Sequence, residues 1–138
     1  MSDYPLNPNL HKEIPETISW GKIPSSVEQS PEYQQKLETL LIAKGWDELE
    51  AYKVSYAFHE ILNNAIIHGN LNLKKSPGES EANWWPKILA AENLPENANK
   101  FITVSISLTA NQIIISIQDQ GINSPEFWKE KTAGMRTG

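Results

Sequence analysis

Residues 58–70 read Phe-His-Glu-Ile-Leu-Asn-Asn-Ala-Ile-Ile-His-Gly-Asn, and the interpretation of the whole chain starts from this stretch. Glu60, Asn64 and His68 stand four residues apart in it. Because side chains three or four residues apart share a helix face, a helix aligns all three along one stripe. Most of the residues between them are apolar, and a carboxylate and an amide buried among them without partners cost free energy. A bound ligand or metal would offset that cost; the alternative is that the polar side chains face water.

Two helices are predicted around this stretch. Ser30 favours a helix start, because its side chain can cap free amides and the proline that follows it suits the first turn. Gly45 ends this first helix. Asp47 caps the second helix, with a glutamate at the capping-box position, and apolar residues at three-four spacing carry that helix to Gly69.

Strand patterns flank the two helices. Residues 17–23 alternate weakly and predict a short strand. Residues 101–108 and 113–118 alternate apolar and polar side chains, which is typical of a half-buried antiparallel hairpin. Helices packed on the apolar face of this sheet make an α+β two-layer sandwich. Residues 17–138 are expected to form this domain, and residues 1–16, rich in proline and asparagine, precede it as an irregular arm.

One long polar segment separates the second helix from the hairpin. Residues 71–100 are interpreted as a loop, with one or two helical turns at residues 87–92. Trp84 and Trp85 are expected to pack onto the sheet or the arm; the alternative is an exposed surface for a partner.

The end of the chain shows no apolar periodicity over residues 129–138. The segment after Phe127 is therefore expected to be mobile and to contribute no strand. The edge of the sheet beside residues 113–117 would then remain unpaired, which favours a homodimer.

Composition excludes several classes of function. The chain has 138 residues, a net charge of −5 and no cysteine. The negative charge makes it a poor binder of nucleic acid, and the lack of cysteine removes disulfides, thiolate catalysis and cysteine zinc sites. No apolar run is long enough for a membrane helix, and the N-terminus lacks the pattern of a signal peptide. We therefore expect a soluble cytoplasmic protein that binds neither nucleic acid nor membranes.

The pattern Glu60-x-x-x-Asn64-Ala65-x-x-His68-Gly69 resembles the N-box of the GHKL (histidine kinase-like) ATPase family, especially its anti-sigma-factor serine kinase branch. The resemblance implies the fold of that family, an antiparallel or mixed sheet covered by helices on one face. It also implies that this chain lacks the C-terminal elements of the family fold.

A second motif follows the predicted hairpin. Residues 119–123 read Asp-Gln-Gly-Ile-Asn and are similar to the family's G1 box, Asp-x-Gly-x-Gly, with Asn123 at the place of the second glycine. Asparagine tolerates positive φ better than most residues, so the turn is compatible with Asn123. The third motif, a glycine-rich phosphate-binding turn called the G2 box, is not complete by Gly138; the Gly-x-x-x-Gly pattern of Gly134 and Gly138 is either its beginning or a frayed end. The resemblance therefore predicts a truncated or degenerate member whose 138 residues are inactive as an enzyme.

The resemblance implies that the site binds Mg-ATP. Asn64 becomes the Mg²⁺ ligand, and Glu60 becomes the catalytic group that orients or deprotonates an attacking hydroxyl. Asp119 accepts a hydrogen bond from the adenine amino group. The remaining implied nucleotide-binding residues are His68, Gly121 and Asn123.

Two functions follow from the resemblance. The first is an ATP-binding regulatory domain that transfers a phosphoryl group from Mg-ATP to a protein partner: a sigma factor, an anti-anti-sigma protein or an attached signalling domain. The alternative is a non-catalytic protein-interaction module on the same scaffold. His59 is assigned no phosphoacceptor role, and the histidine spacing does not fit zinc ligands on one helix.

Overall fold

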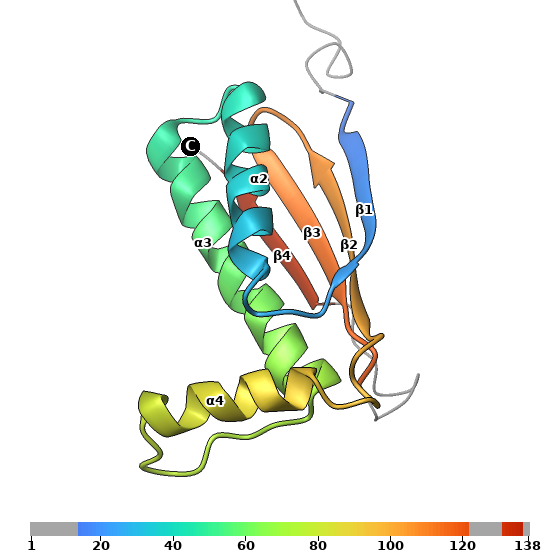
Figure 1. The fold of residues 1–138 in the computed structure, drawn as a ribbon. Coiled ribbons are helices and arrows are strands. Elements are labelled where there is room, and N and C mark those ends of the chain that lie inside the picture. The colour runs from blue at the N-terminus through green and yellow to red at the C-terminus, as the bar shows by residue number, and fades with distance from the viewer. Residues whose placement is uncertain (1–13, 122–130, 137–138) are drawn as a thin grey trace, which may run out of the picture.

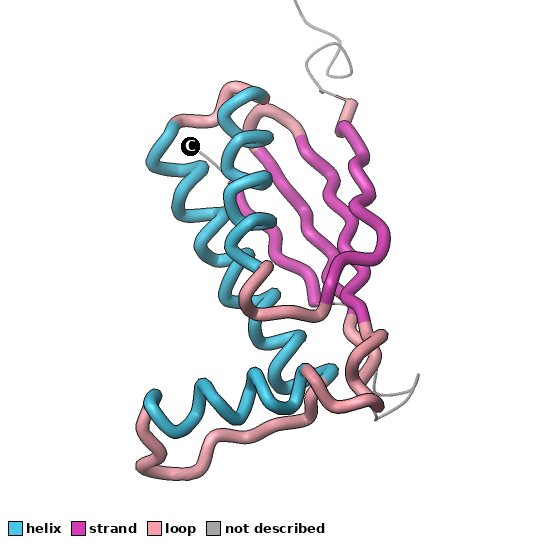
Figure 2. The backbone as a smooth tube through the Cα atoms, in the orientation of Figure 1, coloured by secondary structure: helices cyan, strands magenta, loops and turns pink. Residues whose placement is uncertain are grey.

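The computed structural model describes residues 14–121 and 131–136, with a sheet on one side and helices on the other (Figures 1 and 2). Helices α2 and α3 lie side by side over one face of the sheet, and α4 crosses below the end of α3 (Figure 1). The predicted α+β fold with two helices over an antiparallel sheet is confirmed. The elements in chain order are β1 (Glu16–Pro24), α2 (Ser30–Ala43), α3 (Glu48–Asn64), the π-helix η1 (Ala65–Asn70), α4 (Glu81–Glu92), β2 (Phe101–Leu108), β3 (Gln112–Gln118) and β4 (Lys131–Arg136).

The sheet has four antiparallel strands in the order β1-β2-β3-β4. Strands β2 and β3 form the predicted hairpin, with Ile106 opposite Ile115 in the register. Alternate residues of both strands point into the core beneath the helices, and the serines and threonine between them lie on the other face. The buried residues of the two strands are Ile102, Val104, Ile106, Leu108, Ile113, Ile115 and Ile117.

Strand β1 confirms the strand predicted over residues 17–23, and it contains a bulge. The register with β2 shifts between Ser19 and Gly21, which leaves Trp20 as the extra residue. Gly21 has φ of +63°, a conformation that a residue with a side chain adopts at a cost. The shift turns Ile23 into the core, where it is 3% exposed. An uninterrupted alternation from Ile18 would have pointed Ile23 outward.

Strand β4 overturns the expectation that the end of the chain adds no strand. Its residues pair with β3, with Ala133 opposite Ile115 and Met135 opposite Ile113. The segment needs no apolar alternation of its own, because the open edge of β3 supplies partners for its backbone amides and carbonyls. The edge that motivated the expected homodimer is therefore paired within the chain. The remainder of the segment expected to be mobile, residues 128–130 and 137–138, lies outside the described residues.

Ser30 does not cap α2 as predicted. The N-cap residue is Gln29, which makes no side-chain capping bond. Ser30 is instead buried, and its hydroxyl lies 2.8 Å from Asn63 Oδ1 and 3.1 Å from His59 Nε2. The hydroxyl thus links α2 to α3. The predicted cap at Asp47 is confirmed, since its carboxylate accepts the amides of the second and third residues that follow it.

Helix α4 occupies residues 81–92 of the segment that was predicted as a loop over residues 71–100, and so begins six residues before the helical turns expected at residues 87–92. Ser80 caps it by accepting the amide of Asn83. Trp84, Ile88 and Ala91 share one face and are buried, whereas Trp85 is 42% exposed. The expectation that both tryptophans pack inward is therefore right for one of them. Pro86 lies inside this helix, where it removes one backbone hydrogen bond and its ring crowds the carbonyl four residues earlier. Burial of the apolar face outweighs that cost.

Glu92 joins the end of α4 to the loop between β1 and α2. Its Oε2 accepts the amide of Val27 at 2.8 Å. Burial raises the pKa of Glu92 above its ordinary value, and the negative charge of Glu28 adds to this effect. Because the native state favours the protonated form, this contribution to stability is present below the ordinary pKa and is lost as pH rises through the raised pKa.

We therefore expect Glu92→Gln to be more stable than the natural chain at pH 7.5 and equally stable at pH 4. The amide still accepts the bond from Val27 but carries no charge. Because Glu92 is partly exposed, the expected gain stays below about 1 kcal/mol. Urea unfolding at the two pH values measures it, with the exposed Glu96→Gln as the matched control. A gain of equal size at both pH values would contradict the prediction.

No helix in the described part of the chain combines the length and the apolar character that are needed to cross a bilayer.

Candidate functional site

The predicted second helix changes type at the centre of the N-box-like stretch. α3 ends at Asn64, and residues 65–70 continue as the π-helix η1, in which Leu71 N donates to Ile66 O across five residues at 2.9 Å. The prediction of an α-helix up to Gly69 is therefore wrong for its last turn. His68 lies within this π turn, whereas Glu60 and Asn64 lie on α3. Such turns occur often at functional sites.

Glu60 and Asn64 are exposed on α3. The sequence pattern pointed to a ligand because burying these two polar side chains would cost free energy. Since both are exposed, that cost does not arise. Both side chains remain one turn apart on the same helix face, and both are accessible to a ligand that lies over α3.

Asn70 is the buried polar residue of the stretch, with 2% of its surface exposed. Its Oδ1 accepts the backbone amide of Gln120 at 2.6 Å. Its Nδ2 donates to Ser25 Oγ and to the carbonyl of Phe101, both at 3.0 Å. Lys100 Nζ donates to its backbone carbonyl at 2.8 Å. Asn70 thus fastens the end of η1 to the turn that follows β3.

Gly69 lies directly against Asp119. A Cβ added at Gly69 would come within 2.9 Å of the Cβ of Asp119 and would overlap its carboxyl group. Asp119 Oδ1 accepts the amide of Gly121 at 2.8 Å, which closes the turn. A Cβ at Gly121 would in turn lie 3.3 Å from the carbonyl oxygen of Gly69. The two motifs identified in the sequence therefore meet, and both glycines permit the close approach.

The other predicted site residues have different positions. His68 is exposed, and its Nδ1 lies 2.7 Å from the carbonyl oxygen of Leu73. Because a carbonyl only accepts, this ring nitrogen donates, and it holds the segment after η1 in place. Asn123 lies outside the described residues. His59 is half-buried, and its Nε2 lies 3.1 Å from Ser30 Oγ and 3.4 Å from Asn63 Nδ2.

Sequence reasoning missed the role of Asn70. Its signal was present in the quoted stretch, as a polar residue directly after the glycine that was expected to end the helix. The pairing with Gln120 could not be inferred, because fifty residues separate the two.

Among residues 14–121 and 131–136, no three histidine, cysteine, aspartate or glutamate side chains gather closely enough to hold a metal ion. No family model, curated protein or solved structure matches this chain.

Proposed function

We propose that this chain is a nucleotide-binding domain of the GHKL type that binds Mg-ATP over α3 and the turn after β3. The observation that supports the proposal is the contact of Gly69 with Asp119, because it joins the two family-like motifs at one place. The hydrogen bond of Asn70 to Gln120 fixes that contact from the core side.

Each residue has a chemical task in this proposal. Asp119 offers a carboxylate acceptor to the adenine amino group, and Gly69 and Gly121 leave the space that the Asp119 carboxyl group and the backbone of Gly69 occupy. Asn64 offers an amide oxygen, which suits Mg²⁺ because this ion takes few protein oxygens alongside phosphate and water. Asn64 and Glu60 are both exposed, so a bound nucleotide and its metal ion can reach them.

We expect phosphoryl transfer only where a phosphate-binding turn completes this site, because no complete turn of that kind is recognisable among the 138 residues. Mg-ATP, when bound, supplies the phosphoryl group, and transfer depends mainly on positioning and charge neutralisation. Glu60 accepts the proton of the attacking hydroxyl, which belongs to water or to a serine of a protein partner. The resemblance points to a sigma factor, an anti-anti-sigma protein or a signalling domain as that partner. His68 positions the end of η1 through Leu73 and contacts no nucleotide in this proposal.

A non-catalytic interaction module is the second candidate, and an exposed apolar stripe on α3 favours it. Leu49 is 60% exposed, and Tyr52 and Tyr56 are each 50% exposed. The two tyrosine rings stack with centroids 6.2 Å apart. Tyr52, Tyr56 and Glu60 follow one another at four-residue spacing, so a partner on the tyrosines would also cover Glu60.

Calorimetric titration with Mg-ATP tests the proposal, and Asn64→Ala tests the metal role. We expect the substitution to weaken Mg-ATP by about tenfold, or ~1.4 kcal/mol, and to leave metal-free ATP unchanged. The exposed Asn99→Ala is the matched control. Absence of binding by the natural chain would favour the interaction module, and equal weakening of both forms of the nucleotide would remove Asn64 from the metal.

Base selectivity tests the role of Asp119. Adenine presents an amino group where guanine presents a carbonyl, and an acceptor that a bound base covers without donating to it costs about 1–3 kcal/mol. We therefore expect the chain to prefer ATP over GTP by about tenfold or more. Comparable affinities in competition titrations would place Asp119 outside the base-binding site.

A further inference from the structure

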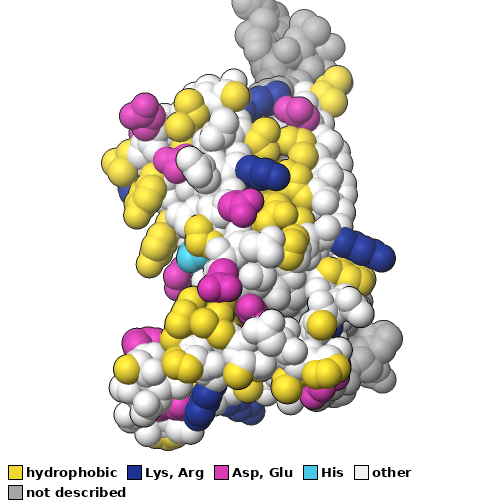
Figure 3. Space-filling model, in the orientation of Figure 1, with side chains coloured by type: hydrophobic (Ala, Val, Ile, Leu, Met, Phe, Trp, Pro, Cys, Tyr) yellow, Lys and Arg dark blue, Asp and Glu magenta, His cyan; other side chains and the backbone are white. Residues whose placement is uncertain are grey.

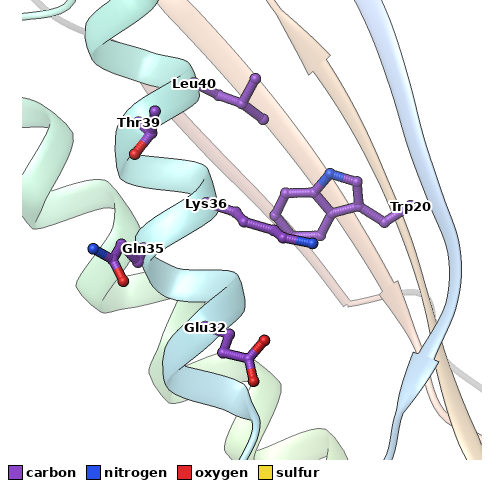
Figure 4. A pocket seen from close by; sticks show the side chains of 6 residues that line it. All are labelled: Trp20, Glu32, Gln35, Lys36, Thr39 and Leu40. Atoms are coloured by element: carbon purple, nitrogen blue, oxygen red, sulfur yellow. The ribbon is translucent and has the colours of Figure 1, made fainter.

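A predominantly apolar groove of about 530 Å³ lies between β1 and α2, and Lys36 extends across it toward Trp20 (Figure 4). Hydrophobic side chains gather between these two elements on the molecular surface (Figure 3). A second cavity, of about 340 Å³, has a different character, because most of the side chains that line it are polar or charged. Its volume falls within the range of sites that bind small organic molecules.

The polar cavity opens where three segments meet: the loop between β1 and α2, the end of α4, and the loop that leads into β2. In Figure 1 the end of α4 lies below the loop that joins β1 to α2. The bond from Val27 N to Glu92 Oε2 holds these two segments together. Asn70 supplies a second link, since its Nδ2 donates to Ser25 Oγ and its backbone carbonyl accepts Lys100 Nζ. The walls are therefore held in place by the fold, which limits the entropy cost of binding a ligand.

The α4 end of the cavity presents acceptor oxygens. Asn93 and Asn97 direct their Nδ2 groups to the backbone carbonyls of Leu89 and Ala91, both at 2.8 Å. Within the described part of the chain, nothing donates to the Oδ1 atoms of these two amides or to Oε1 of Glu92. The C-terminal end of the α4 dipole adds partial negative charge here. This end therefore suits a cationic group that donates several hydrogen bonds, such as a primary ammonium.

Two carboxylates of the cavity have no counter-charge. Glu28 and Glu92 both line it, and neither forms an ion pair with a described side chain. Burial raises the pKa of Glu92, and the negative charge of Glu28 acts in the same direction. A bound ammonium group supplies the missing positive charge and favours the ionised form of Glu92.

Lys100 provides a pole of the opposite sign. Its Nζ lies 2.8 Å from the carbonyl oxygen of Asn70, and this bond uses one of the three donors of an ammonium group. Ser25 Oγ accepts a bond from Asn70 at 3.0 Å, so the hydroxyl proton of Ser25 remains available to a ligand. Because both groups bond the same residue, they lie close together. A carboxylate can accept a hydrogen bond from each of them.

We propose that this cavity binds a small zwitterion of the amino-acid type. Its ammonium group binds Glu92 and the amide oxygens of Asn93 and Asn97, and its carboxylate binds Lys100 and Ser25. Lys100 repels a ligand that is only a cation, and the two carboxylates repel one that is only an anion, whereas a zwitterion is attracted at both ends. The inference is independent of nucleotide binding, because no residue that lines this cavity belongs to the proposed nucleotide site.

Titration of the ¹⁵N-labelled full chain with each of the common amino acids tests the proposal by NMR at pH 7.5. We expect at least one of them to give saturable shifts of the backbone amides of Val27 and Asn97 below about 10 mM. Two compounds derived from that amino acid serve as matched ligands. Its amide lacks the carboxylate, its deaminated acid lacks the ammonium group, and each should bind at least about tenfold more weakly.

Glu92→Gln tests the site from the side of the protein. The variant keeps an acceptor for Val27 and removes only the charge, so the fold is retained. We expect it to bind the same amino acid at least about tenfold more weakly, and the exposed Glu96→Gln to bind it unchanged. The proposal is overturned if no amino acid shifts these amides up to about 10 mM, if Glu92→Gln binds as the natural chain does, or if either matched ligand binds equally well.

Discussion

Replacing Asn70 with alanine is expected to cost about 3 kcal/mol of unfolding free energy. The residue is 2% exposed, and its side chain bonds Gln120, Ser25 and Phe101. Removing the amide leaves the backbone amide of Gln120 and the carbonyl of Phe101 without this partner in a partly buried region. Each such unpaired group costs about 1–3 kcal/mol, and a small cavity adds to the loss.

Urea unfolding measures this loss, with Asn99→Ala as the control, because Asn99 is exposed. Asn70→Asp distinguishes the contribution of the amide oxygen from that of the amide nitrogen. It keeps an acceptor for Gln120 but replaces the donor to Phe101 by an oxygen, so it should remain strongly destabilised. A loss below about 0.5 kcal/mol for the alanine variant would mean that Asn70 does not hold the turn.

The parts of the fold that the sequence predicts are those determined by local periodicity. The hairpin follows from alternation over residues 101–118, and α2 and α3 follow from three-four spacing between caps and glycines. In each of these elements one face is apolar, so the pattern also indicates which face is buried. That is sufficient to deduce helices over one face of an antiparallel sheet.

The parts that the sequence does not predict depend on contacts distant along the chain. β4 forms on an edge that β3 provides, although its own residues do not alternate. α4 has a short apolar face and contains Pro86, so this helix depends on burying that face in the core. The π turn at residues 65–70 allows Asn70 to reach Gln120, a partner fifty residues away.

In the candidate site, too, the sequence predicts what depends on local spacing and not what depends on distant contacts. Glu60 and Asn64 were identified from their spacing alone, but the pattern could not reveal that both are exposed. Asp119 was identified from the turn after a strand. Its contact with Gly69 depends on how the two elements pack, for which the sequence carries no local signal.

Gly69→Ala is expected to disrupt the site, although alanine is the better helix former by about 1 kcal/mol. The added methyl group would meet the Cβ of Asp119 at 2.9 Å and overlap its carboxyl group. Overpacking of this kind typically costs about 1–3 kcal/mol, so the variant should be less stable than the natural chain by roughly 1–2 kcal/mol. Displacing the carboxylate should also weaken ATP by about tenfold or more, since the acceptor for adenine moves.

A double-substitution cycle with Asp119→Gly tests the contact between residues 69 and 119 through stability alone, without a measurement of nucleotide binding. Glycine at position 119 removes both the carboxyl group and the Cβ that the new methyl group would meet. In that background, Gly69→Ala should therefore stabilise the chain, because only the gain in helix propensity remains. The sign of its effect reverses between the two backgrounds, with a coupling energy of about 1–3 kcal/mol. Additive effects in urea unfolding would mean that the two residues do not touch, and the two motifs would then no longer form one site.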